Sequence, residues 1–272
     1  MCGIVGYVGP RKAVPLLLEG LKRLEYRGYD SAGIAVVMNG GLIVKKAAGK
    51  IAVLESQLKG DLLNATTGIA HTRWATHGAP TTRNAHPHTD RDGTLAVVHN
   101  GIIENATALR KMLSERGHPF ISETDTEVIA HLIREFYNGS LADAVAQALG
   151  ELEGAYGIAV ISAKEPDTIV AARKGSPLLV GIGEGENFVA SDPSAVLAYT
   201  RSVIYLDEGD MAVVRPDGYQ IMDRHAVPLS KKVHQIEWDL ATIERGGFQH
   251  FMLKEICEQP ESVHNTFRGR LL

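Results

Sequence analysis

Apolar and polar positions alternate along this chain at two different periods, which divide it into strand-like and helical segments. Residues 3–8 are apolar in the manner of a strand. A helical period follows from residue 11 to 24, with Leu17, Leu21 and Leu24 on one face. The same criteria predict strands over 32–38, 42–47, 67–74 and 95–98, and helices over 51–58, 105–116, 124–137 and 140–152.

Turn and capping signals support these boundaries. Asn39-Gly40-Gly41 predicts a hairpin between two of the strands, and Gly117 predicts a helix end. Thr124-x-x-Glu127 and Ser140-x-x-Asp143 predict capping boxes at two helix starts. Between them, residues 77–92 are rich in His, Pro, Thr and Asn without an apolar period, which indicates a long functional loop.

From Tyr156 onward the pattern changes to short strands separated by turns. The predicted strands are 156–162, 168–172, 178–182, 188–190, 203–206, 211–215 and 219–222. Strand groups at both ends with helices between them predict two sheets covered by helices, an α+β layered domain. After Asp223 this spacing ends, and only a helix near residues 251–257 is indicated.

Composition narrows the class of protein. The 272 residues, 44% hydrophobic and 22% charged, are typical of a soluble chain with a substantial core. The net charge of -4 gives no basic field for nucleic acid or a membrane surface. We expect no secretory signal and no transmembrane helix, since no run of about 18 apolar residues exists. Two cysteines, Cys2 and Cys257, fit a reducing compartment, so the predicted location is cytoplasmic.

Cys2 is the first candidate for chemistry. A small second residue allows an aminopeptidase to remove Met1, which would leave Cys2 with a thiol and a free α-amine. Their ordinary pKa values, about 8.5 and about 7.7–8.0, allow proton exchange near neutrality. Nucleophile and general base would then share one residue. The alternative is a buried or incidental cysteine near a disordered start. Cys257 lies far from every other candidate, and we expect it to be an inert helical thiol.

An amide-cleaving site also needs an oxyanion hole and groups that recognise the substrate. Asn100-Gly101, after a predicted strand, can supply an amide N–H and a backbone N–H, although the pair also commonly makes a turn. Arg73 can hold a carboxylate and Trp74 can contribute to a lid; the alternative is a surface ion pair and a core tryptophan. Asp125, at a helix start, can bind an ammonium group or simply face the helix dipole.

No metal or cofactor site is expected. Five histidines cluster in the sequence, at positions 71, 77, 86, 88 and 99, but without H-E-x-x-H or paired cysteines at zinc spacing. Gly181-x-Gly183-x-Gly185 lacks the spacing of a dinucleotide-binding loop.

With these residues in view, the chain resembles the class II glutamine amidotransferases, whose N-terminal nucleophile (Ntn) domains use a first-residue cysteine. The start CGIVGYVG carries this likeness. More narrowly, the chain is similar to the glutamine–fructose-6-phosphate aminotransferase family. That similarity lies in LEYRGYDSAGIAVV (24–37), HTRWATHG (71–78), NAHPH (84–88), VVHNGIIEN (97–105), SETDTEVIAHL (122–132), GAYG (154–157), ARKGSPL (173–179) and ASD (190–192).

The resemblance implies a four-layer αββα sandwich and assigns roles to matching positions. Cys2 would be the nucleophile, and Asn100 with Gly101 the oxyanion hole. Arg73 would bind the α-carboxylate of L-glutamine and Asp125 its α-amine. The other residues implied are the loop that closes over glutamine, Thr76, His77 and Gly78; Trp74, near the ammonia exit; and Arg27, which orders the terminus.

The resemblance also implies a division of the chain and a larger enzyme. Residues 1–224 would be the glutaminase domain. Residues 225–272 would be a linker and the start of a sugar-phosphate isomerase (SIS) region that is otherwise absent here. The intact enzyme, expected as a homodimer, would convert fructose-6-phosphate to glucosamine-6-phosphate in hexosamine biosynthesis. Two alternatives stay open: the glutaminase of another amidotransferase, such as the amidophosphoribosyltransferase type, or a catalytically silent glutamine-binding domain.

Overall fold

The computed structural model describes residues 2–58, 64–223, 226–237 and 248–267. The chain falls into two compact units, Met1–Ile236 and Glu237–Leu272. The predicted boundary between 224 and 225 falls outside the described residues and stays a prediction. In the second unit the described helix is α7 (Phe251–Phe267), longer than predicted, with Pro260 inside it and Cys257 exposed.

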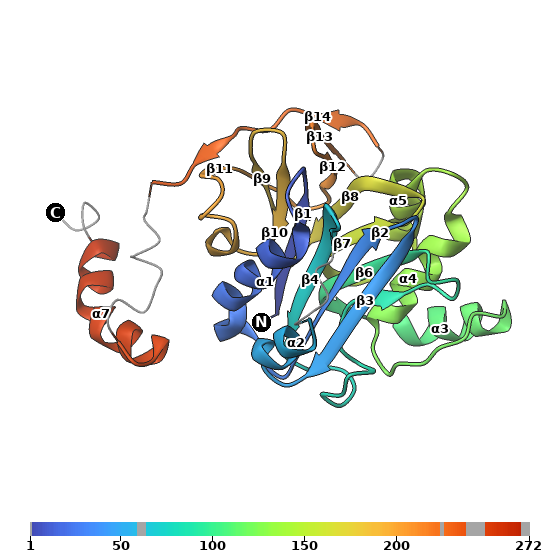
Figure 1. Ribbon diagram of the computed structural model, residues 1–272, viewed down its shortest axis with the longest axis horizontal. Coiled ribbons are helices and arrows are strands. Elements are labelled where there is room, and N and C mark those ends of the chain that lie inside the picture. The colour runs from blue at the N-terminus through green and yellow to red at the C-terminus, as the bar shows by residue number, and fades with distance from the viewer. Residues whose placement is uncertain (1, 59–63, 224–225, 238–247, 268–272) are drawn as a thin grey trace. The chain divides into compact units, whose positions relative to one another are not determined.

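Two antiparallel sheets form the first unit (Figure 1). The eight-stranded sheet has the order β15 (His234–Gln235), β11 (Ser202–Tyr205), β9 (Leu179–Ile182), β10 (Asn187–Ala190), β1 (Gly3–Val8), β4 (Thr67–Arg73), β2 (Ser31–Met38) and β3 (Gly41–Ala48). The seven-stranded sheet has the order β14 (Pro228–Leu229), β13 (Gly218–Met222), β12 (Met211–Arg215), β8 (Glu165–Lys174), β7 (Gly154–Ser162), β6 (Leu95–Ile103) and β5 (His88–Thr89).

Helices cover the outer face of each sheet. On the eight-stranded sheet these are α1 (Ala13–Leu24), which contacts β1 and β4, and α2 (Ile51–Leu58), which contacts β2 and β3. On the other sheet, α4 (Thr126–Phe136) and α5 (Leu141–Glu151) pack on the strands, and α3 (Ala106–Glu115) packs on α4. Short 3₁₀ turns occupy Glu25–Arg27 and Pro193–Ala195. The predicted four-layer αββα sandwich is confirmed.

Glycines in the strands let α1 lie close to its sheet. A Cβ on Gly3 would come within 2.8 Å of Leu24, and one on Gly68 within 2.9 Å of Leu17. The apolar face predicted for α1 is therefore the face that packs on β1 and β4. The opposite side of this sheet faces the second sheet across a core that includes Ile4, Ile69, Val98 and Ile161.

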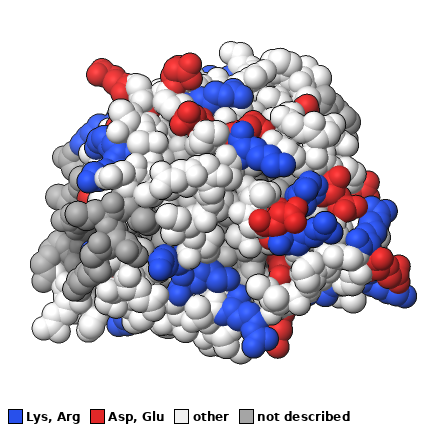
Figure 2. All heavy atoms as spheres, turned by 45° about the vertical axis from the view of Figure 1, so that its right-hand side comes forward, with Lys and Arg blue, Asp and Glu red and all other residues white. Residues whose placement is uncertain are grey.

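Charged side chains of both signs lie interspersed on the face shown in Figure 2. Ion pairs among the described residues include Arg134 with Asp92 at 2.9 Å and Arg116 with Glu135 at 3.1 Å. No helix among the described residues is both long and apolar enough to cross a bilayer.

Candidate functional site

Strand alternation brings three of the predicted site residues to one end of the space between the sheets. Alternate residues of β1, β4 and β6 enter the inter-sheet core, as Ile4, Ile69 and Val98 do. Continuing each alternation reaches Cys2, just before β1, Arg73, the last residue of β4, and Asn100, within β6. In the β1–β4 ladder Gly3 pairs with Thr72, so Cys2 comes opposite Arg73. Residues far apart in sequence therefore meet at the edge of the sandwich.

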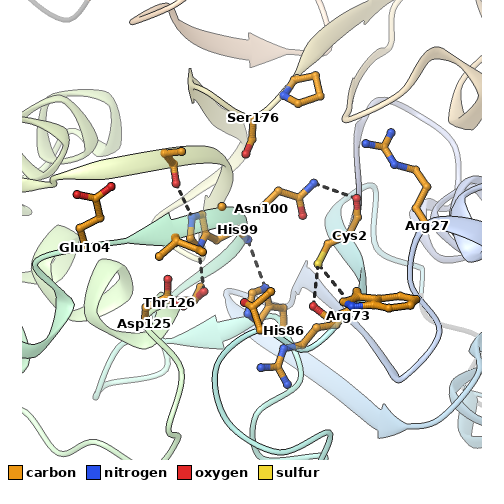
Figure 3. A pocket seen from close by; sticks show the side chains of 16 residues that line it. Cys2, Arg27, Arg73, His86, His99, Asn100, Glu104, Asp125, Thr126 and Ser176 are labelled. Carbon is orange, nitrogen blue, oxygen red and sulfur yellow. Dashed lines mark hydrogen bonds between the residues drawn. The ribbon is translucent and has the colours of Figure 1, made fainter.

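They line a cavity of about 450 Å³ (Figure 3). Cys2 and Arg27 lie on one side of it, and Glu104 and Asp125 on the other. The remaining lining residues are Arg73, Trp74, Thr76, His86, His99, Asn100, Gly101, Ile102, Thr126, Ala155, Ser176 and Pro177. Such a space is of the size that small-molecule sites have.

The Cys2 thiol is held by the backbone of Trp74. The Trp74 N–H donates to Sγ at 3.2 Å, and Sγ lies 3.6 Å from the Trp74 carbonyl oxygen. Burial raises the pKa of the Cys2 thiol, an effect that the Trp74 N–H only partly offsets. At neutral pH the thiol is therefore protonated, and nucleophilic attack requires a base that removes its proton.

Asn100 and Gly101 do not form a turn. β6 continues through both residues to Ile103, so the predicted strand end at residue 98 was wrong. Asn100 Nδ2 donates to the Cys2 carbonyl at 3.2 Å, and Gly101 has φ +137°. A Cβ at position 101 would lie 2.0 Å from the Ala155 carbonyl oxygen, so only glycine fits where β6 passes β7.

Arg73 is buried, which excludes the alternative of a surface ion pair. Its guanidinium donates to the carbonyls of His77 and, at 3.4 Å, Ala79, and so anchors the start of the predicted loop. Burial lowers the pKa of Arg73, while Asp30 acts in the opposite direction. Trp74 is 49% exposed rather than in the core, and its ring stands edge-on to Tyr29 at 5.5 Å.

Asp125 connects β6 to the start of α4. It occupies the N-cap position, and its Oδ2 accepts a hydrogen bond from the Ile103 N–H at 2.9 Å. The predicted Thr124-x-x-Glu127 capping box was wrong, since no side chain caps this helix. The Glu127 carboxylate instead accepts from the backbone of Ile121 and Ser122, at 2.9 and 2.8 Å. At α5 the Ser140 side chain does cap, accepting from the Asp143 N–H.

Two predicted site residues lie apart from this cavity. His77 lines a second space of about 360 Å³ that Glu104 and Asp125 also border. Gly78, with φ +74°, lines neither space. Thr76 and Arg27 do line the first cavity, and Arg27 Nη1 reaches the Ser191 carbonyl at 3.3 Å and the Asp192 carboxylate at 3.1 Å.

Other lining residues were not predicted as site residues. Glu104 borders the cavity because it directly follows β6, which ends at Ile103. The sequence did not indicate this position, because the Asn100-Gly101 pair favours a turn that would end the strand earlier. Ser176 follows β8 and lies across the cavity from His86 (Figure 3). The ARKGSPL block that contains Ser176 was a signal of likeness, but nothing in its spacing indicated a place at this cavity.

Four of the five clustered histidines are buried together. The rings of His71 and His86 are 4.3 Å apart, and those of His86 and His88 5.0 Å. Burial lowers the pKa of His71 to about 3 and also lowers the pKa values of His86, His88 and His99. Within the described ranges, no three His, Cys, Asp or Glu side chains are arranged to hold a metal ion.

Comparisons with known proteins find similarity to glutamine amidotransferases and aminotransferases. Residues 71–198 match the family described as "Glutamine amidotransferase domain". The chain is 52% identical over 272 residues to the glutamine–fructose-6-phosphate aminotransferase [isomerizing] of Caldanaerobacter subterraneus subsp. tengcongensis. It is 55% identical over 271 residues to the enzyme of that name from Aquifex aeolicus. All of the chain is matched, but it spans only 45% and 46% of these relatives' length.

Solved structures share the fold. The glutamine phosphoribosylpyrophosphate amidotransferase of B. subtilis has a TM-score of 0.72 and 28% identity, covering 82% of this chain and 49% of that one. A glutamine aminotransferase class-II domain protein from Silicibacter pomeroyi has a TM-score of 0.57 at 18% identity. It covers 82% of this chain and 99% of its own, a likeness of fold alone.

Proposed function

The chain contains a glutamine amidotransferase domain, and from that premise we propose that it hydrolyses the side-chain amide of L-glutamine to glutamate and ammonia. The observation that carries the proposal is the gathering of Cys2, Arg73, Asn100, Gly101 and Asp125 around one cavity. These residues supply a nucleophile, oxyanion donors from the Asn100 side chain and the Gly101 backbone, and one charge of each sign to hold an amino acid.

The reaction begins with a proton transfer. With Met1 removed, the α-amine of Cys2 takes the thiol proton as Sγ attacks the amide carbon. The developing oxyanion accepts from Asn100 Nδ2 and the Gly101 N–H. The Asn100 amide has two N–H groups. One of them donates to the Cys2 carbonyl, so the other can donate to the oxyanion. The leaving nitrogen takes a proton and departs as ammonia, and water then hydrolyses the thioester to glutamate.

Charge places the substrate. The Arg73 guanidinium would bind the α-carboxylate, and the Asp125 carboxylate would bind the α-ammonium. Thr76, His77 and Gly78 belong to the loop that would close over bound glutamine, and the exposed Trp74 would border the path of ammonia. Because Arg73 already bonds two carbonyls of that loop, substrate binding and loop position would be coupled.

In a longer protein the ammonia would be transferred to an acceptor. The two similar aminotransferases, about twice as long as this chain, favour fructose-6-phosphate as that acceptor and glucosamine-6-phosphate as the product. We further propose that a sugar-phosphate isomerase region supplies the acceptor site, and that such an enzyme is a cytoplasmic homodimer.

Glutamate release from glutamine, measured together with intact mass, tests the proposal. We expect turnover by the Met-processed protein and none by Cys2→Ala. Steady glutamate formation by Cys2→Ala would contradict the assignment. Processed protein that binds glutamine without turnover would instead favour the silent binding domain.

A further inference from the structure

The strand that carries Asn100 and Gly101 has one open edge at the site. β5 is two residues long and pairs with Ala96 and Val97 of β6. Beyond Val97, no other described strand continues the pairing on that side. In an antiparallel strand the N–H and C=O of one residue point to the same side, and alternate residues repeat the direction. His99 and Gly101 therefore direct their backbone N–H groups toward this open edge.

Two buried histidine side chains occupy the edge in place of a strand. The His99 N–H donates to His86 Nδ1 at 3.4 Å (Figure 3). The His99 carbonyl oxygen lies 3.1 Å from His71 Nε2. These contacts satisfy both backbone groups of His99 and leave the Gly101 N–H, two residues on, facing the cavity.

The His71 Nε2 atom has a second hydrogen-bond neighbour, the side chain of Asn100. Its Nε2 lies 3.0 Å from Asn100 Oδ1 as well as 3.1 Å from the His99 carbonyl oxygen. Both neighbours are acceptors, so Nε2 carries the hydrogen. The ring is fully buried and is neutral across the physiological range. A flipped Asn100 amide would present its own N–H to this donor, which is repulsive.

We propose that His71 is a positioning residue: its neutral Nε2–H fixes the Asn100 amide so that Nδ2 faces Cys2, where the oxyanion of the proposed reaction would form. This inference rests on the proposed glutaminase function. His71 does not line the cavity, so it acts through Asn100 and not on substrate. Its removal should therefore lower kcat and leave the KM for glutamine nearly unchanged.

Two substitutions at His71 separate donor position from polarity. His71→Gln places an amide N–H near the former Nε2, whereas the shorter His71→Asn ends near the former Nδ1. We expect His71→Asn to lower kcat about tenfold, the factor that corresponds to one lost hydrogen bond, at unchanged KM. His71→Gln should stay within about threefold of the unmodified protein. His118→Asn is the matched control, since His118 is also buried but bonds Glu135 at 2.6 Å, away from the cavity.

Results of three kinds would overturn the inference. They are equal kcat in His71→Asn and the unmodified protein, an effect confined to KM, or the same loss of kcat in His118→Asn. If His71→Asn does not fold, ¹⁵N NMR of the unmodified protein decides. The His71 ring should be neutral with hydrogen on Nε2 from pH 5 to 8, and the opposite tautomer or a charged ring would refute the proposal. Absence of glutamate release by the unmodified protein would refute the glutaminase function, whereas the NMR result would still test the hydrogen bond.

Discussion

Gly101→Ala is the substitution whose effect the structure defines best. The new Cβ would start 2.0 Å from the Ala155 carbonyl oxygen, where real contacts stay beyond 3.0 Å. β6 and β7 would have to separate by about 1 Å, and a displacement of that size at a reacting group costs on the order of 100-fold in rate. The φ of +137° adds on the order of 1–3 kcal/mol of backbone strain for a residue with a Cβ.

Ladder hydrogen bonds lost between the strands, at about 1 kcal/mol each, bring the expected destabilisation to roughly 2–4 kcal/mol. For a protein of this size that lowers Tm by roughly 5–15 °C. The assays are glutamate release and thermal unfolding of the full chain. We expect kcat to fall about 100-fold with a smaller change in KM.

Gly93→Ala is the control for a positive φ without a steric clash. Gly93 has φ +64°, and an added Cβ would meet nothing within 4 Å. It should lose about 1–2 kcal/mol of stability from backbone strain alone, at unchanged kcat. If Gly101→Ala were no slower and no less stable than Gly93→Ala, the close approach of β6 to Ala155 would not matter and the reasoning would be refuted.

Three further predictions concern charge and the thiol. Arg73→Lys should raise the KM for glutamine about 10-fold or more, because a point charge replaces a two-pronged donor; an unchanged KM in steady-state kinetics would exclude the carboxylate role. Burial raises the pKa of Glu127, but His131 and the donors from Ile121 and Ser122 outweigh it and hold that pKa at about 2. This folded value lies below the ordinary 4.5, so the ionised Glu127 carboxylate stabilises the fold at higher pH, and Glu127→Gln should lower the free energy of unfolding by about 3 kcal/mol at pH 7. In urea unfolding, the difference in stability between the unmodified protein and Glu127→Gln should disappear as the pH falls from 4.5 toward 2. A difference that does not change with pH would contradict this prediction. In protein that retains Met1, alkylation of the Cys2 thiol should rise only at a pH above the ordinary cysteine midpoint, because burial raises the pKa of this thiol. Mass spectrometry after iodoacetamide treatment at several pH values measures the extent of labelling. Full labelling of Cys2 at pH 7 would contradict the prediction.

Local pattern predicted most elements because their apolar periods are uninterrupted. The bounds of α2 (Ile51–Leu58) and β12 (Met211–Arg215) agree with the sequence prediction. The sequence predictions of strand ends and short strands fail where hydrogen bonds to other parts of the chain determine the structure. Asn100-Gly101 favours a turn locally, but pairing with β7 carries β6 through it to Ile103. The two-residue strands β5, β14 and β15 have no period of their own and exist only through their neighbours.

At the candidate site, too, the sequence predicts which residues matter better than it predicts their contacts. Sequence chemistry alone makes Cys2, Asn100, Arg73 and Asp125 candidates, and the resemblance assigns their roles. The structure brings all four to one cavity, and their roles stay predictions. Sequence reasoning could not show that His77 borders a different space. The spacing of the clustered histidines shows that they are near one another in sequence but does not reveal their hydrogen-bond partners, so the pattern alone is compatible with metal ligands.

The position of β1 has a consequence for the order of events during synthesis. β1 lies between β4 and β10, and its Val5 pairs with Ala190. At about 5–20 residues per second, the ribosome needs roughly 10–40 s to reach that partner after making the first strand. Until then one side of β1 has no neighbour, and such non-local pairing is slow to form. The removal of Met1 that the proposed function requires would therefore have time to occur before β10 covers that side of β1, the strand that follows Cys2.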